Sequence, residues 1–376
     1  MNQLITLYHL IFVVKIKNNM RVCILGSGLS ALTLAKALVN QNIYVDMFVK
    51  KKINNPDLSR TLGISKSNIE FYNKNIINIQ NIIWKIKKIE IFTDKLKNEK
   101  LLKFEDKNKE IFSILKNFKL NQALEKSLYK SKYFSKINKK KDNIAEKYNL
   151  VINTDYYADI TKKYFSKKLE KKYNSYAYTS IIDHKKVKND IATQIFTEKG
   201  PIAFLPISNT ETSIVYSINN INNQTYKTIK GLINFYNFRY KINKINKINY
   251  FRLNSLSLRS YYNGNILAFG DLLHRIHPLA GQGFNMTIRD VKILLSIIKE
   301  KQNLGLPLDT SVNSEFEKKS RHKNYIFLNG VDFIHEFFNF ERKTKNNLLS
   351  KSVQLLGKNP SINKMFAKIA DKGLLF

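Results

Sequence analysis

The sequence predicts an α/β protein, and two segments with the order strand, glycine-rich loop, helix carry this prediction. The first begins with the apolar strand Arg21–Leu25, which leads through closely spaced glycines into a helix. The second begins with the apolar run Asn265–Phe269 and continues through Gly281–Gly283 into an amphipathic helix over Phe284–Ile298. Short apolar runs that end at glycine are typical of buried strands, and in open α/β sheets ligands bind where such strands end.

The composition fits a globular chain with one large domain or two. The chain has 376 residues, of which 43% are hydrophobic, and a formal net charge of +35. Such a charge suits anionic partners (nucleic acid, anionic lipid or an acidic protein), although abundant lysine throughout the chain gives the same total by compositional drift. Because no nucleic-acid-binding motif accompanies the charge, we do not expect nucleic acid as a partner. The single cysteine, Cys23, lies in an apolar run and is expected to be a buried small side chain.

Residues 1–19 are expected to be a non-native or mobile extension. The apolar run Leu4–Val14 is too short to span a bilayer, and it lacks the flanking features of a signal peptide. We expect Met20 to be the working start. A short membrane-contacting extension is the alternative.

The first glycine-rich loop has the spacing of a dinucleotide-binding fingerprint. Gly26, Gly28 and Ala31 form a Gly-x-Gly-x-x-Ala pattern between the strand Arg21–Leu25 and a helix that reaches about Asn40. Gly26 is expected to make the tight turn, Gly28 to let a pyrophosphate approach, and Ala31 to allow close helix packing.

The second segment carries many special positions in a short span. Gly270 and Asp271 let the chain leave the strand and place a carboxylate at its carboxyl end. The helix start near Gly283 suits an electron-rich or anionic group, because exposed N–H groups and the positive end of the helix dipole lie there. His274 and His277 with Asp271 could form a metal site, but no further ligand completes the set and we expect no metal. The residues alone predict an anion or cofactor site.

The spacing of these positions resembles the class A flavin monooxygenases and, within them, the ubiquinone-biosynthesis hydroxylases. The motif positions are Gly270, Asp271, His274, His277, Pro278, Gly281, Gln282, Gly283, Asn285 and Asp290. Further segments that resemble the family are Ser59–Ser65, Asn149–Asp155 and Phe196–Ile207, with Arg321, Asn324 and Asp332 near the carboxyl end. Phe196–Ile207 narrows the resemblance to the ubiquinone branch.

The resemblance implies FAD as the cofactor and assigns residues to it. Asp271 would bond the ribityl chain, Arg60 would meet the phosphate and ribose region, and Asp155 would approach the pyrophosphate. Residues from Gly281 to Phe284 would bring N–H groups toward the flavin ring, where Pro278 packs. The full expected cofactor-binding set is Gly26, Gly28, Ala31, Arg60, Asp155, Gly270, Asp271, Pro278, Gly281, Gly283, Phe284 and Asn285. Pro278, Gly281, Gln282 and Gly283 flank the flavin, and no catalytic acid or base is assigned.

Two departures from the family pattern predict weaker FAD binding. Val49 stands where the family usually has a glutamate that holds the adenosine ribose, and Asp46 lies earlier on the same strand, Ile43–Val49. Tyr156 replaces a glycine directly after Asp155, which puts a ring where close backbone approach is expected.

The resemblance implies a Rossmann-like FAD-binding domain interleaved with a substrate-binding β-sheet domain, and then a helical carboxyl terminus. We assign 20–75, 111–172 and 263–310 to the FAD-binding domain, 76–110 and 173–262 to the substrate domain, and 311–376 to carboxy-terminal helices. The local patterns predict one strand in Trp84–Asp94, a helix over Ile111–Leu128, and several strands in Tyr176–Ile218. The lysine-rich stretch Lys126–Lys141 is expected to be a solvated loop or hairpin, with a basic binding surface as the alternative.

The activity implied is that of an FAD-dependent monooxygenase. It would hydroxylate the aromatic ring of a polyprenylated phenol in ubiquinone biosynthesis through a flavin C4a-hydroperoxide, with O2 and NAD(P)H or another electron donor. One alternative is a catalytically weakened flavoprotein that acts as an interaction subunit of a quinone-biosynthesis complex, and another is a flavin monooxygenase for a different aromatic substrate. We expect a cytoplasmic protein or one peripheral to the inner face of an anionic membrane, which Asn363–Phe376 could contact as an interfacial helix.

Overall fold

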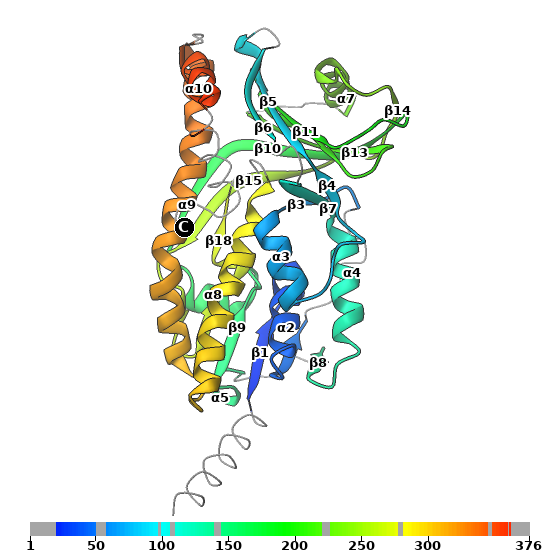
Figure 1. The fold of residues 1–376 in the computed structure, drawn as a ribbon. Helices are drawn as coiled ribbons and strands as arrows, with labels where there is room; N and C mark the ends of the chain where they lie inside the picture. The colour runs from blue at the N-terminus through cyan, green and yellow to red at the C-terminus, as the bar shows by residue number, and fades with distance from the viewer. Residues whose placement is uncertain are drawn as a thin grey trace, which may run out of the picture.

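The computed structural model describes residues 20–49, 58–96, 99–105, 110–138, 144–219, 226–276, 281–344, 348–359 and 361. In these residues the chain folds into a six-stranded sheet and a nine-stranded sheet, with a three-stranded sheet between them (Figure 1). The predicted α/β class with interleaved sheets is confirmed. The predicted extension 1–19 and the predicted interfacial helix 363–376 lie outside the described residues.

The six-stranded sheet draws its strands from three distant stretches of the chain. Its order is β16-β17-β9-β1-β2-β8, and all neighbours are parallel except β16 and β17. The strands are β1 (Arg21–Leu25), β2 (Tyr44–Phe48), β8 (Phe134–Ile137), β9 (Leu150–Asn153), β16 (Tyr262–Asn263) and β17 (Ile266–Ala268). All residues of β9 and all of β1 except the exposed Arg21 are buried, and Cys23 on β1 is fully buried, as expected for a small apolar side chain. Burial raises the pKa of its thiol, with a further contribution from Asp46.

Three helices cover this sheet: α2 (Leu29–Val39), α4 (Asn117–Leu128) and α8 (Gly283–Asn303). Helix α2 packs against both α4 and α8. The amphipathic helix predicted over Phe284–Ile298 is confirmed, and its apolar residues Phe284, Ile288, Val291 and Leu295 are all buried in the main hydrophobic core.

The nine-stranded sheet is mainly antiparallel and forms the upper part of the molecule in Figure 1. Its path is β18-β15-β10-β13-β12-β11-β5-β6, β14 pairs with β10, and β11 and β5 run parallel. The strands are β5 (Lys88–Thr93), β6 (Lys100–Glu105), β10 (Lys168–His184), β11 (Ile191–Thr197), β12 (Gly200–Pro206), β13 (Glu211–Asn219), β14 (Ile242–Ile245), β15 (Asn249–Leu258) and β18 (His274–Arg275). Helix α7 (Tyr226–Tyr236) packs on it through Ile229 and Ile233 and gives this sheet a core of its own.

The three-stranded sheet corrects two predictions. It consists of β3 (Thr61–Ser65), β7 (Phe112–Lys116) and β4 (Trp84–Ile86), in the order β3-β7-β4, and α3 (Lys66–Asn75) follows β3. The helix predicted over Ile111–Leu128 is wrong in its first part, because β7 pairs with β3 and β4 on either side and only α4 is helical. The single strand predicted in Trp84–Asp94 is two strands, since β4 joins this sheet and β5 joins the nine-stranded sheet.

The prediction for Lys126–Lys141 is also wrong in part. Its residues Phe134–Ile137 form β8, the edge strand parallel to β2. Phe134 and Ile137 pack against the main core, which explains why this lysine-rich stretch does not remain a solvated loop.

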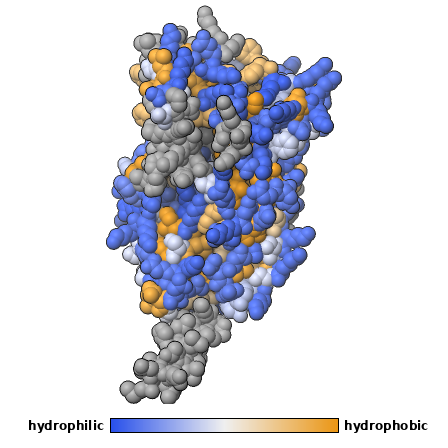
Figure 2. Space-filling view, viewed as in Figure 1, coloured by the Kyte–Doolittle hydropathy of each residue, from blue (hydrophilic) through white to orange (hydrophobic). Residues whose placement is uncertain are grey.

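Long helices complete the described chain, as predicted for the carboxyl-terminal part. Helix α9 (Thr310–Thr344) has 35 residues and runs beside both large sheets, and α10 (Leu348–Lys358) packs on β6 (Figure 1). Short helical segments occur at η1 (Asp94–Leu96), α5 (Ile144–Lys147), α6 (Asp159–Tyr164) and η2 (Gly270–Leu272). None of the helices in the described ranges combines the length and apolar character needed to cross a membrane. Hydrophilic side chains dominate the face shown in Figure 2, with hydrophobic patches among them.

Candidate cofactor site

Three parallel strands of the six-stranded sheet end side by side and bring their loops together. β1 is followed by Gly26, β9 by Thr154 and β17 by Phe269. The backbone N–H groups of Thr154 and Phe269 donate to Leu25 and Asn153 at 2.9 Å, which extends the ladder just past the strand ends. The predicted site residues that follow these strands therefore share one edge of the sheet.

The first glycine-rich loop has the geometry that its sequence predicts. Gly26 has φ +116°, and a Cβ there would lie 2.3 Å from the Thr154 hydroxyl oxygen, so the position requires glycine. Gly28 is exposed and precedes α2, and a Cβ at this position would meet no atom within 4 Å. Ala31 is fully buried on α2. The fold thus uses Gly26 for the turn and leaves open space beside Gly28.

The loop after β17 returns close to this first loop. Gly270 begins η2 and lies so close to α2 that a Cβ there would be 2.6 Å from Ser30. Asp271 follows on η2 with its side chain exposed at the same sheet edge. The structure therefore brings Asp271 near the start of α2, although the two are far apart in the sequence.

The second glycine-rich loop leads directly into α8. Gly281 has φ +64°, and Gln282 is the buried residue that precedes the helix without making a capping side-chain hydrogen bond to it. Gly283 is exposed at the helix start, whereas the Phe284 ring is buried with its centroid 6.3 Å from that of Tyr72. Phe284 consequently presents its backbone, and not its ring, to the loop. Pro278 and His277 lie outside the described residues.

Asn285 ties this loop to the three-stranded sheet. Its Oδ1 accepts hydrogen bonds from the Ser65 backbone N–H at 3.0 Å and from the Asn68 amide at 2.9 Å. Its Nδ2 donates to the carbonyls of Gly63 at 3.0 Å and Gly281 at 3.4 Å. The fully buried side chain thus makes protein contacts through both of its polar atoms.

Arg60 and Asp155, two predicted cofactor-binding residues, lie in different environments. Arg60 is exposed just before β3, with its guanidinium carbon 5.8 Å from the centroid of the Phe251 ring on β15. Asp155 is half-buried after β9, and its Oδ1 accepts a hydrogen bond from the Tyr157 backbone N–H at 2.9 Å. Asp155 thereby shapes its own loop at the sheet edge where the cofactor is predicted.

Tyr156, the replacement for a family glycine, is held by two cations. The Lys168 amine lies 4.8 Å and the Arg275 guanidinium 5.3 Å from the centroid of its ring. Lys168 also donates a hydrogen bond to the Tyr156 hydroxyl at 2.5 Å, and this bond raises the pKa of the lysine. The loop after β9 is therefore rebuilt around a tyrosine packed toward β10 and β18.

The residue directly after β2 is the other departure from the family pattern, Val49. Val49 is half-buried and packs against the main core. Asp46 is buried and forms an ion pair with Arg21 at 2.9 Å, while the Tyr148 hydroxyl donates to it at 2.7 Å. Because Asp46 is already paired with Arg21 and Tyr148 in the protein interior, it does not take over the role of the family glutamate whose position Val49 occupies.

The structure contains a buried polar network that the sequence analysis did not predict. His274 on β18 bonds Asp290 on α8, and the amide of Asn324 on α9 donates to the other carboxylate oxygen at 3.1 Å. Tyr261 bonds Asn324, and burial raises the pKa of this tyrosine. His274 and Asp290 were recognised as motif positions, but their pairing depends on the fold. No group of three residues suited to a metal occurs in the described part of the chain.

Comparison with known proteins links this geometry to flavoproteins. Residues 233–303 match a family model described as an FAD binding domain. Ubiquinone hydroxylase UbiL of Rhodospirillum rubrum is 24% identical over 174 residues, which are 44% of this chain and 41% of that protein. The 3-demethoxyubiquinol 3-hydroxylase of Escherichia coli is 26% identical over 158 residues, 40% of each chain. Mitochondrial ubiquinone biosynthesis monooxygenase COQ6 of Drosophila melanogaster is 30% identical over 119 residues, 31% of this chain and 25% of that one.

Solved structures extend the fold comparison over nearly the whole chain. p-Nitrophenol 4-monooxygenase of Pseudomonas putida gives a TM-score of 0.76 at 11% identity, covering 94% of this chain and 99% of the other. HpxO of Klebsiella pneumoniae, solved with FAD and uric acid, gives a TM-score of 0.74 at 10% identity, covering 96% and 99%. At these identities the likeness concerns the fold, while the sequence matches span less than half of each curated relative named above. The fold, the FAD-binding match and these relatives together identify the chain as a relative of the class A FAD-dependent aromatic hydroxylases, with its sequence similarity in the ubiquinone-biosynthesis branch.

Proposed function

We propose that this protein is an FAD-dependent monooxygenase that hydroxylates the aromatic ring of a polyprenylated phenol in ubiquinone biosynthesis. The observation that carries the proposal is that η2, with its exposed Asp271, packs against both α2 and α8 beside the ends of β1, β9 and β17. The relatives named for ubiquinone hydroxylation support the substrate class.

The residues present fit FAD at this edge. The open space beside Gly28 suits a pyrophosphate, and neither α2 nor α8 has its first turn capped by the side chain that precedes it. Unpaired N–H groups in a first helical turn favour anionic groups. Asp271 is acceptor-only when ionised, so it suits the hydroxyl groups of a ribityl chain.

The chain would bind and orient the reactants while the cofactor carries the chemistry. Bound FAD would supply the oxygen-transfer chemistry, with NAD(P)H or another donor as the reductant and O2 as the source of the oxygen atom added to the ring, the other oxygen atom leaving as water. The N–H groups at the start of α8 would stabilise negative charge on the flavin ring. Ile276 and Met286, which flank the second glycine-rich loop, are buried and apolar and would help to exclude water from the phenol.

We place this activity at an anionic membrane surface, peripheral to the inner face, with a ubiquinone-biosynthesis complex as the expected assembly. The net charge of +35 favours anionic headgroups, and a lipidic substrate lies in the bilayer. Exposed apolar side chains on α9 and α10, among them Phe333, Phe340 and Leu355, suit an interface. Salt-reversible co-sedimentation with anionic but not neutral vesicles is the expected result, and no binding to either vesicle would contradict it.

One observation favours a second function, that of a weakly flavin-binding interaction subunit. Val49 offers no ribose acceptor, and Asp46 on the same strand is engaged with Arg21 and Tyr148. The absorption spectrum of the purified protein separates the two functions, because a stoichiometric flavin band supports the enzyme.

The site itself is tested by Asp271→Ala. We expect this variant to lose flavin affinity while its unfolding curve is unchanged, because the side chain is exposed. Glu146→Ala is the matched control, since Glu146 is an exposed acid on α5, which precedes β9 and so lies at the opposite end of the sheet. Equal flavin affinity in both variants would show that the site assignment is wrong.

A further inference from the structure

A cavity of about 580 Å³ lies between α9 and the carboxyl end of β15. It is bounded by Leu169 on β10, by the segment from Ser257 to Tyr262, and by one face of α9 from Ser314 to Tyr325, and we name it the α9 groove. None of the described cofactor-binding residues lines it. Ligand-binding cavities in proteins commonly hold about 300–1,000 Å³, so this groove has room for a ligand.

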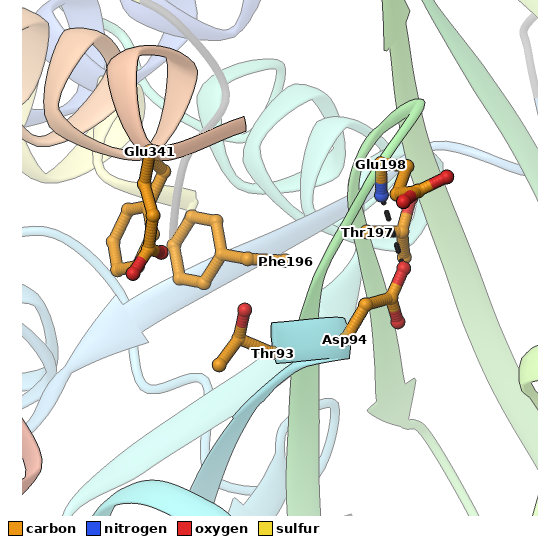
Figure 3. Close-up of a pocket in the computed structure, with 7 residues that line it drawn as sticks. Thr93, Asp94, Phe196, Thr197, Glu198 and Glu341 are labelled. Carbon is orange, nitrogen blue, oxygen red and sulfur yellow. Dashed lines mark hydrogen bonds between the residues drawn. The ribbon is translucent and has the colours of Figure 1, made fainter. Parts of the chain in front are cut away.

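A second cavity, beside Phe196, is far smaller (Figure 3). It has a volume of about 10 Å³, and Glu341 of α9 and Thr93 lie around it. The rings of Phe196 and Phe338 stack there with centroids 3.6 Å apart. This is room for about one water molecule, so the small cavity is a gap in a packed core and offers no place for a ligand.

Cations dominate the charge of the α9 groove. Arg259, Lys318 and Arg321 line it with exposed side chains, and Glu317 is the acid among the described residues around it. Arg321 bonds Glu317 through one guanidinium nitrogen at 3.0 Å, which leaves its other N–H groups for a further acceptor. Arg259 and Lys318 form no ion pair within the described part of the chain. Two guanidinium groups and an ammonium group suit phosphate, which they bind through charge-assisted hydrogen bonds.

The floor of the groove is held by buried hydrogen bonds. Tyr261 lines the groove with only 1% of its surface exposed, and it bonds Asn324 of α9. Asn324 donates to Asp290 on α8 at 3.1 Å, and Asp290 bonds His274 on β18. This network ties α9 to α8 and to the nine-stranded sheet, so the walls of the groove are already in place before a ligand binds.

The exposed face of α9 continues from the groove as a stripe of aromatic side chains. Lys318, Tyr325, Phe333 and Phe340 follow one another at spacings of seven or eight residues, which places them on one face of the helix. Tyr325 is 56% exposed, Phe333 69% and Phe340 60%. Exposed aromatic rings beside basic side chains suit a membrane interface. A phosphate compound dissolved in water would leave these rings without a contact.

Two acids of α9 lie near this stripe, and both are bonded to β10. Glu336 accepts a hydrogen bond from the Lys171 amine at 2.8 Å, which compensates its charge. Asp332 is half-buried and accepts a hydrogen bond from the Tyr173 hydroxyl. The cations of the groove have no such partner apart from Glu317, so the groove end of the stripe is its positive end.

We infer that the α9 groove binds the phosphate of an anionic phospholipid headgroup, and that the aromatic stripe of α9 contacts the same membrane. The inference rests on the peripheral membrane location proposed above and adds to it the binding site and the chemical group bound. Arg259, Lys318 and Arg321 hold the phosphate. Leu169, which is 48% exposed at the edge of the groove, contacts the glycerol and the first methylene groups of the lipid.

Neutral variants of the full-length protein test the inference. The groove variant carries Arg259→Gln, Lys318→Gln and Arg321→Gln. The matched control replaces three exposed lysines, Lys185, Lys186 and Lys241, by glutamine, and so removes the same charge where β10 ends and β14 begins. All six side chains are exposed, so the unfolding curves of both variants should match that of the wild type. The probes are vesicles of phosphatidylcholine, alone or mixed with phosphatidylglycerol, in a co-sedimentation assay.

We expect the groove variant to bind the phosphatidylglycerol vesicles at least tenfold more weakly than the wild type, and the control variant to bind nearly as well as the wild type. Glycerol 3-phosphate should displace the wild type from these vesicles at a concentration at which sodium sulfate of equal ionic strength does not. Equal binding by the groove and control variants would overturn the inference, because total charge would then account for binding. The membrane location would stand in that case.

Calorimetric titration of glycerol 3-phosphate separates a lipid headgroup from a soluble ligand. We expect the groove variant to lose both glycerol 3-phosphate binding and vesicle binding. Loss of glycerol 3-phosphate binding with unchanged vesicle binding would overturn the lipid assignment and show that the groove takes a soluble phosphate compound. A wild type that binds neither kind of vesicle would overturn the inference together with the membrane location. The proposed hydroxylase activity is tested separately, by the flavin spectrum.

The aromatic stripe is tested by Phe333→Ala. This variant should bind phosphatidylglycerol vesicles more weakly and glycerol 3-phosphate as tightly as the wild type, because Phe333 lies two helical turns beyond the groove residue Tyr325. Unchanged vesicle binding would refute the contact between the stripe and the membrane.

Discussion

The Asn285→Ala variant tests whether the Asn285 side chain stabilises the protein through its hydrogen bonds within the chain or contacts the flavin directly. Three of the four hydrogen bonds of the Asn285 side chain are 3.0 Å or shorter, to Ser65, Asn68 and Gly63. At about 1 kcal/mol for each net hydrogen bond, the variant should lose roughly 3 kcal/mol of unfolding free energy. The loss should be present in the flavin-free protein, because all of these partners belong to the chain itself.

The assay is urea unfolding of the flavin-free protein, followed by flavin titration. Asn121→Ala is the control, since this half-buried amide on α4 donates to Asn117 one turn earlier, at 2.7 Å, as its one side-chain hydrogen bond among the described residues, and its loss should cost less than about 1 kcal/mol. We expect Asn285→Ala to weaken flavin binding as well, because Gly281 loses its attachment to β3. If the flavin-free variant were as stable as the wild type but bound flavin more weakly, the structural role of Asn285 would be refuted and a direct contact with the flavin indicated.

Three further predictions concern single side chains. Gly28→Ala should leave the urea midpoint nearly unchanged but weaken flavin binding in a fluorescence titration, because its Cβ meets no protein atom and enters the space assigned to the pyrophosphate; unchanged flavin affinity would contradict this. Val49→Glu should tighten flavin binding by at most roughly 1.5–3 kcal/mol, the value of a hydrogen bond to a charged group, and weaker binding in the same titration would count against the ribose argument. Burial raises the pKa of Glu90, but hydrogen bonds from Lys88 at 2.8 Å and Lys100 at 2.9 Å outweigh it and leave the pKa below its usual value. The stabilisation from this lowered pKa is complete above the ordinary pKa of 4.5 and is lost as the pH falls through the lower pKa of the folded protein. The stabilities of the wild type and Glu90→Gln should therefore converge in acid. Parallel profiles of stability against pH would disprove this prediction.

The sequence was sufficient where structure depends on local pattern. The strand Arg21–Leu25, its glycine-rich turn and the helix after Gly283 were predicted because apolar periodicity and glycine spacing are local properties. The segment Phe112–Lys116 was mistaken for helix because a short apolar run fits either structure until its pairing partners are known. Those partners, β3 and β4, lie earlier in the chain and are not visible in the run itself.

The candidate site shows the same limit. Gly26 and Gly281 were predicted from motif spacing, and the structure places both at turns with positive φ. Three of the four partners of the Asn285 side chain lie more than 200 residues away in the chain, so no local pattern assigns its side chain to them. The two cations that contact Tyr156 come from β10 and β18, whereas Tyr156 lies in the loop after β9. Their contacts likewise could not be predicted from the sequence alone.

The strand order of the six-stranded sheet has a consequence for synthesis on the ribosome. β9 lies between β1 and β17, and β17 is synthesised about 110 residues after β9. At translation rates of about 5–20 residues per second, this interval is on the order of 5 to 25 s. During that time the nascent chain carries an open apolar strand edge, which invites wrong pairing or a chaperone. The proposed FAD site is complete only after the second glycine-rich loop has been made, when β17 has already been synthesised.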